Sequence, residues 1–499
     1  MQNFNNLKIP INFVDYAKKH ILLCLFFLFF VLYFTVGLYL CFFNKAVTNC
    51  IDLIFDMDSS FAYNLVASNM LQINILYKHS FIVIIIKPFL MLATAFFNSA
   101  RVGGLFLQAI IGSGTVCLIY SIINVITNRK NIAVFLALLY GLSISTIIFS
   151  SVYEFYIYSA FISTLLLYYV CVFWNKNIQL NIFDYILMAV ILLCSFGITP
   201  ITCISNLTLI FLLFIRKKQS IKSVFSFLFI FVVLFILYSL LLKFGYFPFM
   251  FGEQDNHIKI FYQIHNNFNR FLLAIKSLYI ESFYGLKIEI GNLHDVALEL
   301  YKQEGIFFAE KQPFGLYIPS LCLISTIVWG LIKNIKNIKS SILLPLIVIV
   351  IINFLEFYIF NTKYSFLFSQ NTLPFLVVLI GVLYNKFSDK FVNIFCSLFI
   401  LWQCICNFYT ISFIEKYVVK KTIDIIGLND FNHFDIWVWI LYSLIISVIL
   451  GVIFFIIRKA TIKDIWNLSS ENKIRIFTVM AFIYMILVSI FTVLFRGMV

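Results

Sequence analysis

Charged residues are scarce in this sequence: Asp, Glu, Lys and Arg make up 12% of its 499 residues, against about 25% in a typical soluble domain. Hydrophobic residues account for 62% of the chain, and its mean hydropathy is +1.00. Apolar runs of about 20 residues, the length that crosses a bilayer, recur from end to end. This pattern excludes an ordinary soluble domain and predicts an all-α polytopic membrane protein.

Motifs that mark many soluble enzymes and metal proteins are also missing. The sequence has no Gly-rich phosphate loop, no GxSxG elbow and no HExxH histidine pair. The eleven cysteines are odd in number and have no CxxC spacing, so neither a disulfide framework nor a zinc site is indicated. The net charge of +14 does not indicate nucleic-acid binding, because lysines and arginines of this kind hold cytoplasmic loops in place.

The basic loops give the expected topology. We predict about 13 transmembrane helices, at 21–43, 102–127, 132–150, 155–174, 182–198, 201–215, 223–242, 314–332, 341–360, 366–384, 391–413, 436–457 and 476–495. With a cytoplasmic N-terminus and 21–43 as an uncleaved signal anchor, every second short loop is basic. These loops lie at 129–130, 176, 216–222, 333–339, 386–390 and 458–475.

The apolar run 79–97 is not counted as a span. It carries Lys87 and Pro88 near its middle, and a charge there is costly in hydrocarbon. Counting it would also place every later basic loop on the outside. We therefore interpret it as an interfacial or re-entrant helix on the outer face.

Long outer loops divide the chain. Residues 1–245 are expected to form a transmembrane module that includes the first outer loop, 44–101. Residues 246–313 form an outer loop with short helices, since "NNFNRFLLAIKSLYIESFYG" has helical periodicity. Residues 314–499 return to transmembrane helices, interrupted by a shorter outer loop at 414–435.

Three aspartates lie where the first predicted helix leaves the membrane, in "NCIDLIFDMDSSFAY". Asp52 is expected to be solvated. Asp56 and Asp58 are flanked by Phe55, Met57 and Phe61, so their segment should lie against lipid or protein. Asp58 also fits the N-cap of a following helix, which is its structural alternative.

Four stretches together resemble the first outer loop and following helices of polytopic GT-C glycosyltransferases. They are "FDMDSSFAY", "KHSFIVIIIKPF", the helix "ARVGGLFLQAIIGSGTVCLIYSII" with its basic turn "NRKN", and "IIFSSVYEFYIYSAF". The likeness is greatest to bacterial members related to the protein O-mannosyltransferase and aminoarabinose transferase group, of the family 39 type. It covers roughly residues 20 to 175 and continues more loosely to about 245. Ser80 stands where the family usually has proline.

The resemblance implies a GT-C-like fold and a specific reaction. A sugar would pass from a polyprenyl-phosphate carrier to an acceptor on the outer face of the membrane. Asp58 would act as general base, with Asp56 in reserve, because a hydroxyl is a weak nucleophile until its proton is removed. Cationic or hydrogen-bonding side chains would stabilise the leaving phosphate, and the candidates are His79, Lys87, Arg101 and Arg270.

Other polar residues have an acceptor-binding or a structural role. Glu154 is expected in the first turn of its helix, where the dipole favours an acid. Glu356 lies within a predicted span, with Lys363 as the nearest basic partner in sequence. For Lys87 and Arg101, snorkelling to the interface is the alternative, and His79 fits an amphipathic surface equally well.

No metal or other cofactor is expected, although the "DMD" triplet would offer hard oxygen ligands to Mg²⁺ or Mn²⁺. The expected partners are a polyprenyl-phosphate-linked sugar, membrane lipids and a glycan, lipid or protein acceptor. The expected location is a bacterial cytoplasmic membrane, with the long loops outside. Two other functions stay open: an O-antigen or polysaccharide polymerase or ligase, and a lipid or sugar flippase or transporter. The sequence leaves the sugar, the carrier and the acceptor undefined.

Overall fold

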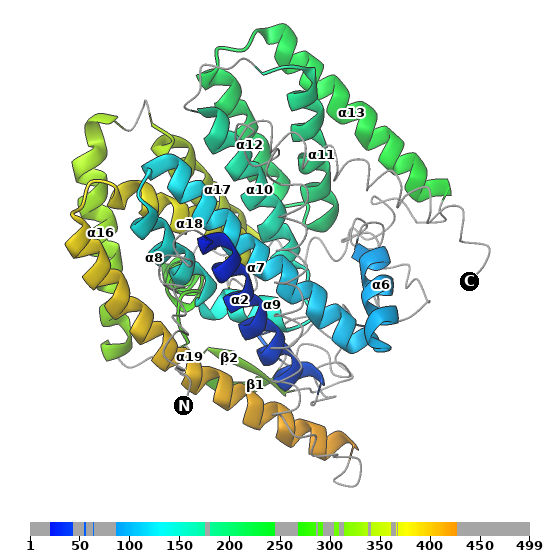
Figure 1. Ribbon diagram of the computed structural model, residues 1–499, viewed down its shortest axis with the longest axis vertical. Coiled ribbons are helices and arrows are strands. Elements are labelled where there is room, and N and C mark those ends of the chain that lie inside the picture. The colour runs from blue at the N-terminus through cyan, green and yellow to red at the C-terminus, as the bar shows by residue number, and fades with distance from the viewer. Residues whose placement is uncertain are drawn as a thin grey trace, which may run out of the picture.

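A computed structural model describes residues 20–42, 54–55, 63, 86–174, 180–244, 268–285, 288–292, 304–308, 314–337, 341–360, 366 and 368–426. This part of the chain is almost entirely helical (Figure 1). Its long elements are α2 (Ile21–Gly37), α7 (Ala100–Thr127), α10 (Tyr156–Trp174), α11 (Ile182–Ile198), α12 (Thr202–Arg216), α13 (Ile221–Phe244), α16 (Ile318–Asn334), α17 (Leu343–Phe360), α18 (Ser369–Tyr384) and α19 (Asp389–Ile426).

Six described helices are long and apolar enough to cross a membrane, or seven if one bent pair counts as a single span. The six lie within α2, α7, α10, α13, α16 and α19, together with a few flanking residues. Shorter apolar helices, α11, α12, α17 and α18, coincide with predicted spans. The described residues therefore belong to an all-α membrane protein, whereas the count of about 13 spans stays a prediction. The last two predicted spans, 436–457 and 476–495, lie outside the described residues.

Helix α7 lies at the centre of the packing. It contacts α2, α10, α18 and two shorter helices, α6 (Lys87–Phe97) and α8 (Lys130–Gly141). Glycine permits a further close approach, to the short helix α9 (Ile144–Ser151): a Cβ added at Gly112 would lie 2.6 Å from the Cβ of Ser150. Small residues at helix crossings are typical of membrane proteins, where close backbone packing replaces the hydrophobic effect. Thus the pattern of glycines in α7 serves packing.

The segment that was not counted as a span contains α6, which has 11 residues. Pro88 lies in its first turn, where the missing N–H costs nothing, and Asn98 ends it in the left-handed conformation. A helix of this length rises about 17 Å, which is too short to cross a bilayer. Because residues 79–85 lie outside the described residues, the exclusion of the whole segment from the spans stays a prediction.

One predicted span is broken. The sequence predicts a continuous helix over 132–150, but α8 ends at Gly141 and α9 (Ile144–Ser151) follows at an angle of 60°. Ser143 caps α9 by accepting a hydrogen bond from the backbone N–H of Thr146. Hydropathy alone does not detect such a break, because both halves are apolar.

Distant side chains satisfy the backbone groups that this break exposes. Gln403 donates to the Leu139 carbonyl at 3.2 Å, and Asn407 donates to the Leu142 carbonyl at 2.6 Å. The N–H groups of Ile144 and Ser145 donate to carbonyls of the 282–283 turn. Irregular backbone is tolerated in a membrane only where protein supplies such partners.

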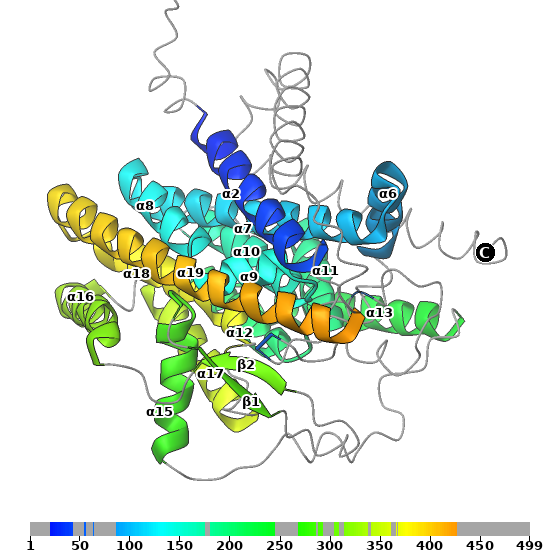
Figure 2. The same ribbon diagram turned by 90° about the horizontal axis from the view of Figure 1, so that it is seen from below.

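Two further expectations need correction. The predicted outer loop 414–435 is helical as far as Ile426, because α19 continues through it as a single helix of 38 residues. The region 246–313 contains α15 (Phe268–Lys276), as its periodicity predicts, but also an antiparallel strand pair, β1 (Ile288–Asn292) and β2 (Glu304–Phe308). Figure 2 shows α15 and the strand pair on the same side of the helical layer. The strands are too short to give a recognisable alternating pattern.

Three of the predicted basic loops, 129–130, 333–339 and 386–390, meet at one end of the bundle. Arg129 donates to the carbonyls of Tyr384, Asn385 and Phe387 and forms a salt bridge with Asp389 at 2.5 Å. The Lys333 ammonium lies 4.7 Å from the centre of the Phe387 ring. We call this the basic end. The side of the membrane on which it lies remains a prediction from the positive-inside rule.

Candidate functional site

Phe55 holds the start of the acidic stretch against the opposite end of the bundle. Its ring lies 4.5 Å from that of Phe308 in β2 and 4.8 Å from that of Phe366, centre to centre. Phe366 in turn lies 5.9 Å from Phe149 in α9. Phe55 also has a φ of 50°, which is unusual for a bulky residue away from a helix end. The residue immediately before Asp56 is therefore buried and conformationally strained.

Tyr63 forms a second anchor beyond the aspartates. Its ring lies 5.3 Å from that of Tyr153, and the Arg101 guanidinium lies 5.5 Å from its centre. The Tyr153 hydroxyl donates to the Arg101 carbonyl, which fixes the start of α7 against the turn before α10. Arg101 is only partly buried. It thus supplies a permanent positive charge beside the second anchor.

Glu154 lies in the turn between α9 and α10 and is 4% exposed. It precedes α10, which begins at Tyr156, so the expected place in a helix first turn is wrong. Its Oε1 instead accepts a hydrogen bond from the Phe155 N–H at 2.8 Å. The turn is held by Gln108 of α7, which donates to the carbonyls of Phe149, Val152 and Glu154. Burial of this carboxyl beside the second anchor makes it a component of the same region.

Lys87 is half-buried at the start of α6, and burial lowers the pKa of its ammonium. The α6 helix packs against α7 near Arg101: a Cβ at Gly103 would lie 2.8 Å from the backbone nitrogen of Thr94. Lys87 and Arg101 therefore belong to two contacting helices, with Lys87 at the end of α6 that is farther from the connection to α7. Of the two, Arg101 is shown to carry its positive charge beside the second anchor, Tyr63.

Two other predicted site residues, Arg270 and Glu356, lie on helices that contact each other. Arg270 belongs to α15, and the adjacent Phe271 packs edge-on against Phe354 and Tyr358 of α17. Glu356 lies on α17 between those two aromatic residues in sequence. Neither of its carboxylate oxygens has a hydrogen-bond partner among the described residues. The sequence did not suggest this pairing of α15 with α17, because about 70 residues separate them.

The remaining predicted site residues, Asp56, Asp58, His79 and Lys363, lie outside the described residues. Asp56 and Asp58 nevertheless stand in sequence between the two anchors, Phe55 and Tyr63. In the part of the chain that the structure describes, no group of three or more His, Cys, Asp or Glu side chains is placed to hold a metal ion. Because the "DMD" triplet is not among those residues, its metal binding stays untested.

Sequence reasoning missed a buried ion pair in this half of the molecule. The Lys276 ammonium lies 2.9 Å from Glu281, to which the Ser277 hydroxyl also donates. Burial raises the pKa of the Glu281 carboxyl, and Lys276 partly opposes that shift. The spacing of these charges along the helical segment was the available signal. Their burial depends on packing that the sequence does not reveal.

In comparison with known proteins, no family model, no curated protein and no solved structure matches this chain.

Proposed function

We propose that this chain transfers a sugar from a polyprenyl-phosphate carrier to an acceptor, at the membrane face opposite its basic end. Asp58, or Asp56 in its place, would take the proton of an acceptor hydroxyl as the hydroxyl oxygen bonds to the anomeric carbon. The bond from that carbon to the phosphate oxygen would break, and the lipid phosphate would leave with the electron pair. The fold would be of the GT-C type.

The observation that carries the proposal is the pair of anchors around the aspartates. Phe55 and Tyr63 both pack at the end opposite the basic loops, and Tyr63 lies against Arg101. A carboxylate base and a cation for the leaving phosphate are the two groups that this reaction needs. Arg101 offers a planar fork that suits phosphate, and Lys87 on the contacting helix offers a point charge.

The test is transfer activity in membranes that contain wild type or Asp58→Asn. Radiolabelled polyprenyl-phosphate sugars are supplied as a panel, and label in endogenous acceptors is counted. We expect the variant to lose transfer by about a hundredfold or more, the usual range for a general base. Asp52→Asn, in the same loop, is the matched control and should retain activity. Equal amounts of inserted protein are verified for each variant.

Equal transfer by wild type and Asp58→Asn would show that Asp58 only caps a helix, and Asp56→Asn would then be tested in the same way. If wild type transfers no sugar from any donor in the panel, the result favours a transport function. The broken helix α8–α9 favours that second candidate, since transporters bind substrates at discontinuous helices. Such binding sites usually involve two broken helices, and the described residues contain one bent pair. A lipid-flipping assay with the same donors would test it.

A further inference from the structure

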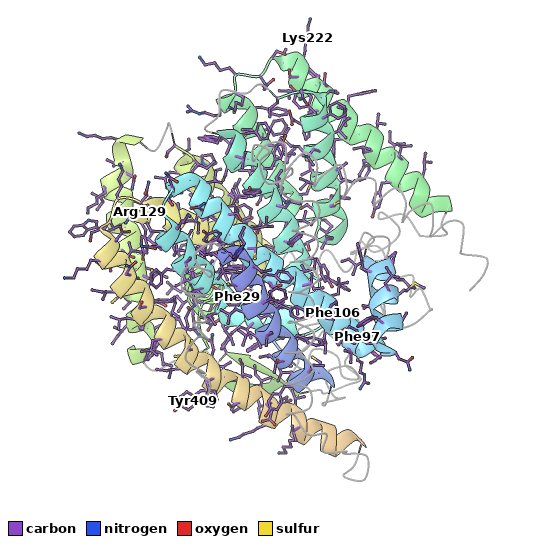
Figure 3. The ribbon with its side chains drawn as sticks, in the orientation of Figure 1. Phe29, Phe97, Phe106, Arg129, Lys222 and Tyr409 are labelled. Carbon is purple, nitrogen blue, oxygen red and sulfur yellow. The ribbon has the colours of Figure 1, made fainter. Side chains whose placement is uncertain are left out.

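The exposed face of α19 is apolar over most of its length and becomes basic near its C-terminal end. Along most of the helix, every third or fourth residue is an exposed apolar side chain. The series consists of Phe391, Ile394, Leu398, Leu401, Ile405, Phe408, Tyr409 and Phe413. Tyr409, one of the most exposed at 71%, lies on the outer edge of the bundle (Figure 3). The next two positions on the same face, Lys416 and Lys420, are exposed lysines.

The length of the apolar series matches the membrane. From Phe391 to Phe413 the helix rises about 33 Å, close to the roughly 30 Å of bilayer hydrocarbon. Tyr409 lies near the end of the series, and tyrosine favours the membrane–water interface. Lys416 and Lys420 follow about 5 Å and 10 Å beyond Phe413 along the axis. In a bilayer whose hydrocarbon matches this series, both ammonium groups would lie in the layer that contains lipid phosphates.

The opposite face of α19 keeps its contacts over the same stretch. Ile414, Tyr417 and Val418 are buried, and Glu415 hydrogen-bonds to Tyr39 in the π-helical turn η1 (Leu38–Phe42) that ends α2. Because one face is held by protein, the lysine face points away from the packed helices. Neither lysine forms a salt bridge among the described residues. Their charge is therefore available to an external anion.

We propose that Lys416 and Lys420 form a binding surface for anionic glycerophospholipid headgroups, in the leaflet opposite the basic end. The occupant follows from charge complementarity and from the position of both lysines at phosphate depth. These two lysines lie on the side that the positive-inside rule expects to be poor in lysine, so topology does not account for them. The surface does not depend on sugar transfer, and a transporter would use it equally well.

The experiment measures lipid retention by the purified full-length protein. Wild type and Lys416→Gln/Lys420→Gln are placed in nanodiscs with equal amounts of phosphatidylglycerol and phosphatidylcholine, extracted in mild detergent, and the bound lipids are counted by native mass spectrometry. We expect the double variant to retain roughly tenfold less phosphatidylglycerol, with phosphatidylcholine unchanged. Raised salt should reduce retention by wild type toward that of the variant.

Two further variants make the result specific. Lys386→Gln/Lys390→Gln removes two exposed lysines, one in the turn before α19 and one in its first turn, and should leave binding at the Lys416 surface intact. Lys416→Arg/Lys420→Arg keeps the charge and should retain phosphatidylglycerol. Equal retention by wild type and the Gln pair would overturn the proposal, as would an equal loss in the control pair. Preferential retention of an added polyprenyl phosphate over phosphatidylglycerol would also overturn it, because the occupant would then be a carrier lipid.

Discussion

The two ends of the bundle are built differently. At the basic end, helices finish in regular ways: Asn128 and Lys218 close α7 and the α12 turn in the left-handed conformation, and Arg129 ties neighbouring loops through carbonyls and Asp389. At the opposite end lie the broken helix α8–α9, two π-helical turns, a strand pair and the strained Phe55.

This difference separates two uses of polar groups. The basic end exposes its charges to water, where a salt bridge contributes little to stability. The opposite end buries polar groups, and several of them, such as Gln403 and Asn407, make long-range hydrogen bonds that are costly to disturb. Irregular backbone and buried polar networks thus concentrate where the sequence predicts chemistry.

The largest expected effect comes from Asn407→Leu. The side chain of Asn407 donates to the Leu142 carbonyl and accepts from the Gly285 N–H, so the variant leaves two buried backbone groups without partners. We expect a loss of about 2 to 4 kcal/mol in the free energy of unfolding. Unfolding of the purified protein in mixed detergent micelles measures it.

Asn334→Leu is the matched control at the basic end. Asn334 is also buried, but its side chain donates only to the Gly330 carbonyl of its own helix. A loss below about 1 kcal/mol is expected, because that carbonyl keeps its helical partner. Equal losses for the two variants would contradict the difference between the ends.

A pH dependence is expected from Glu281, which is buried beside Lys276. Burial raises the pKa of its carboxyl above 4.5 in the folded protein. The unfolded chain therefore releases this proton at lower pH than the folded protein, so the contribution of Glu281 to stability falls as pH rises through the raised pKa. Unfolding measured from pH 4 upward should show this decline in wild type and a flatter profile in Glu281→Gln. If stability depended on pH in the same way in wild type and Glu281→Gln, Glu281 would not be the cause of the decline.

Phe55 tests whether backbone strain at the first anchor is real. Both Phe55→Gly and Phe55→Ala remove the ring contacts with Phe308 and Phe366. Since the φ of 50° suits glycine and strains alanine, the Gly variant should be the more stable by about 1 kcal/mol. This reverses the usual order of the two residues in folded segments. Thermal unfolding of the pair decides it, and an Ala variant as stable as the Gly variant would exclude the strained conformation.

The smallest effect is expected from Asp389→Asn at the basic end. The Asp389 side chain is 61% exposed, and Arg129 keeps three carbonyl partners without it. The free energy of unfolding should change by less than about 1 kcal/mol, and still less at high salt. A loss of unfolding free energy as large as that of Asn407→Leu would contradict the proposed difference between the two ends.

Local patterns predicted a substantial part of this structure. Hydropathy located the helices, and the basic residues identified loops that meet at Arg129. The exclusion of 79–97 as a span stays a prediction, because α6 covers only its second part. Helical periodicity also located α15.

Features that depend on distant residues were not predictable. The break after Gly141 is stabilised by Gln403 and Asn407, and no local window contains both sides of that interaction. The burial of Glu154 depends likewise on Gln108. The continuation of α19 through 414–426 was missed because its charges suggested a loop, whereas one face of the helix stays packed against protein.

The broken helix also has a consequence in time. Asn407 follows its partner Leu142 by 265 residues. At synthesis rates of about 5 to 20 residues per second, that interval lasts roughly 13 to 50 seconds. Throughout it, α8 and α9 would be in the membrane while α19 has not yet been made. Until α19 is made, the carbonyls of Leu139 and Leu142 in the newly inserted helices therefore lack the side chains that donate to them in the folded protein.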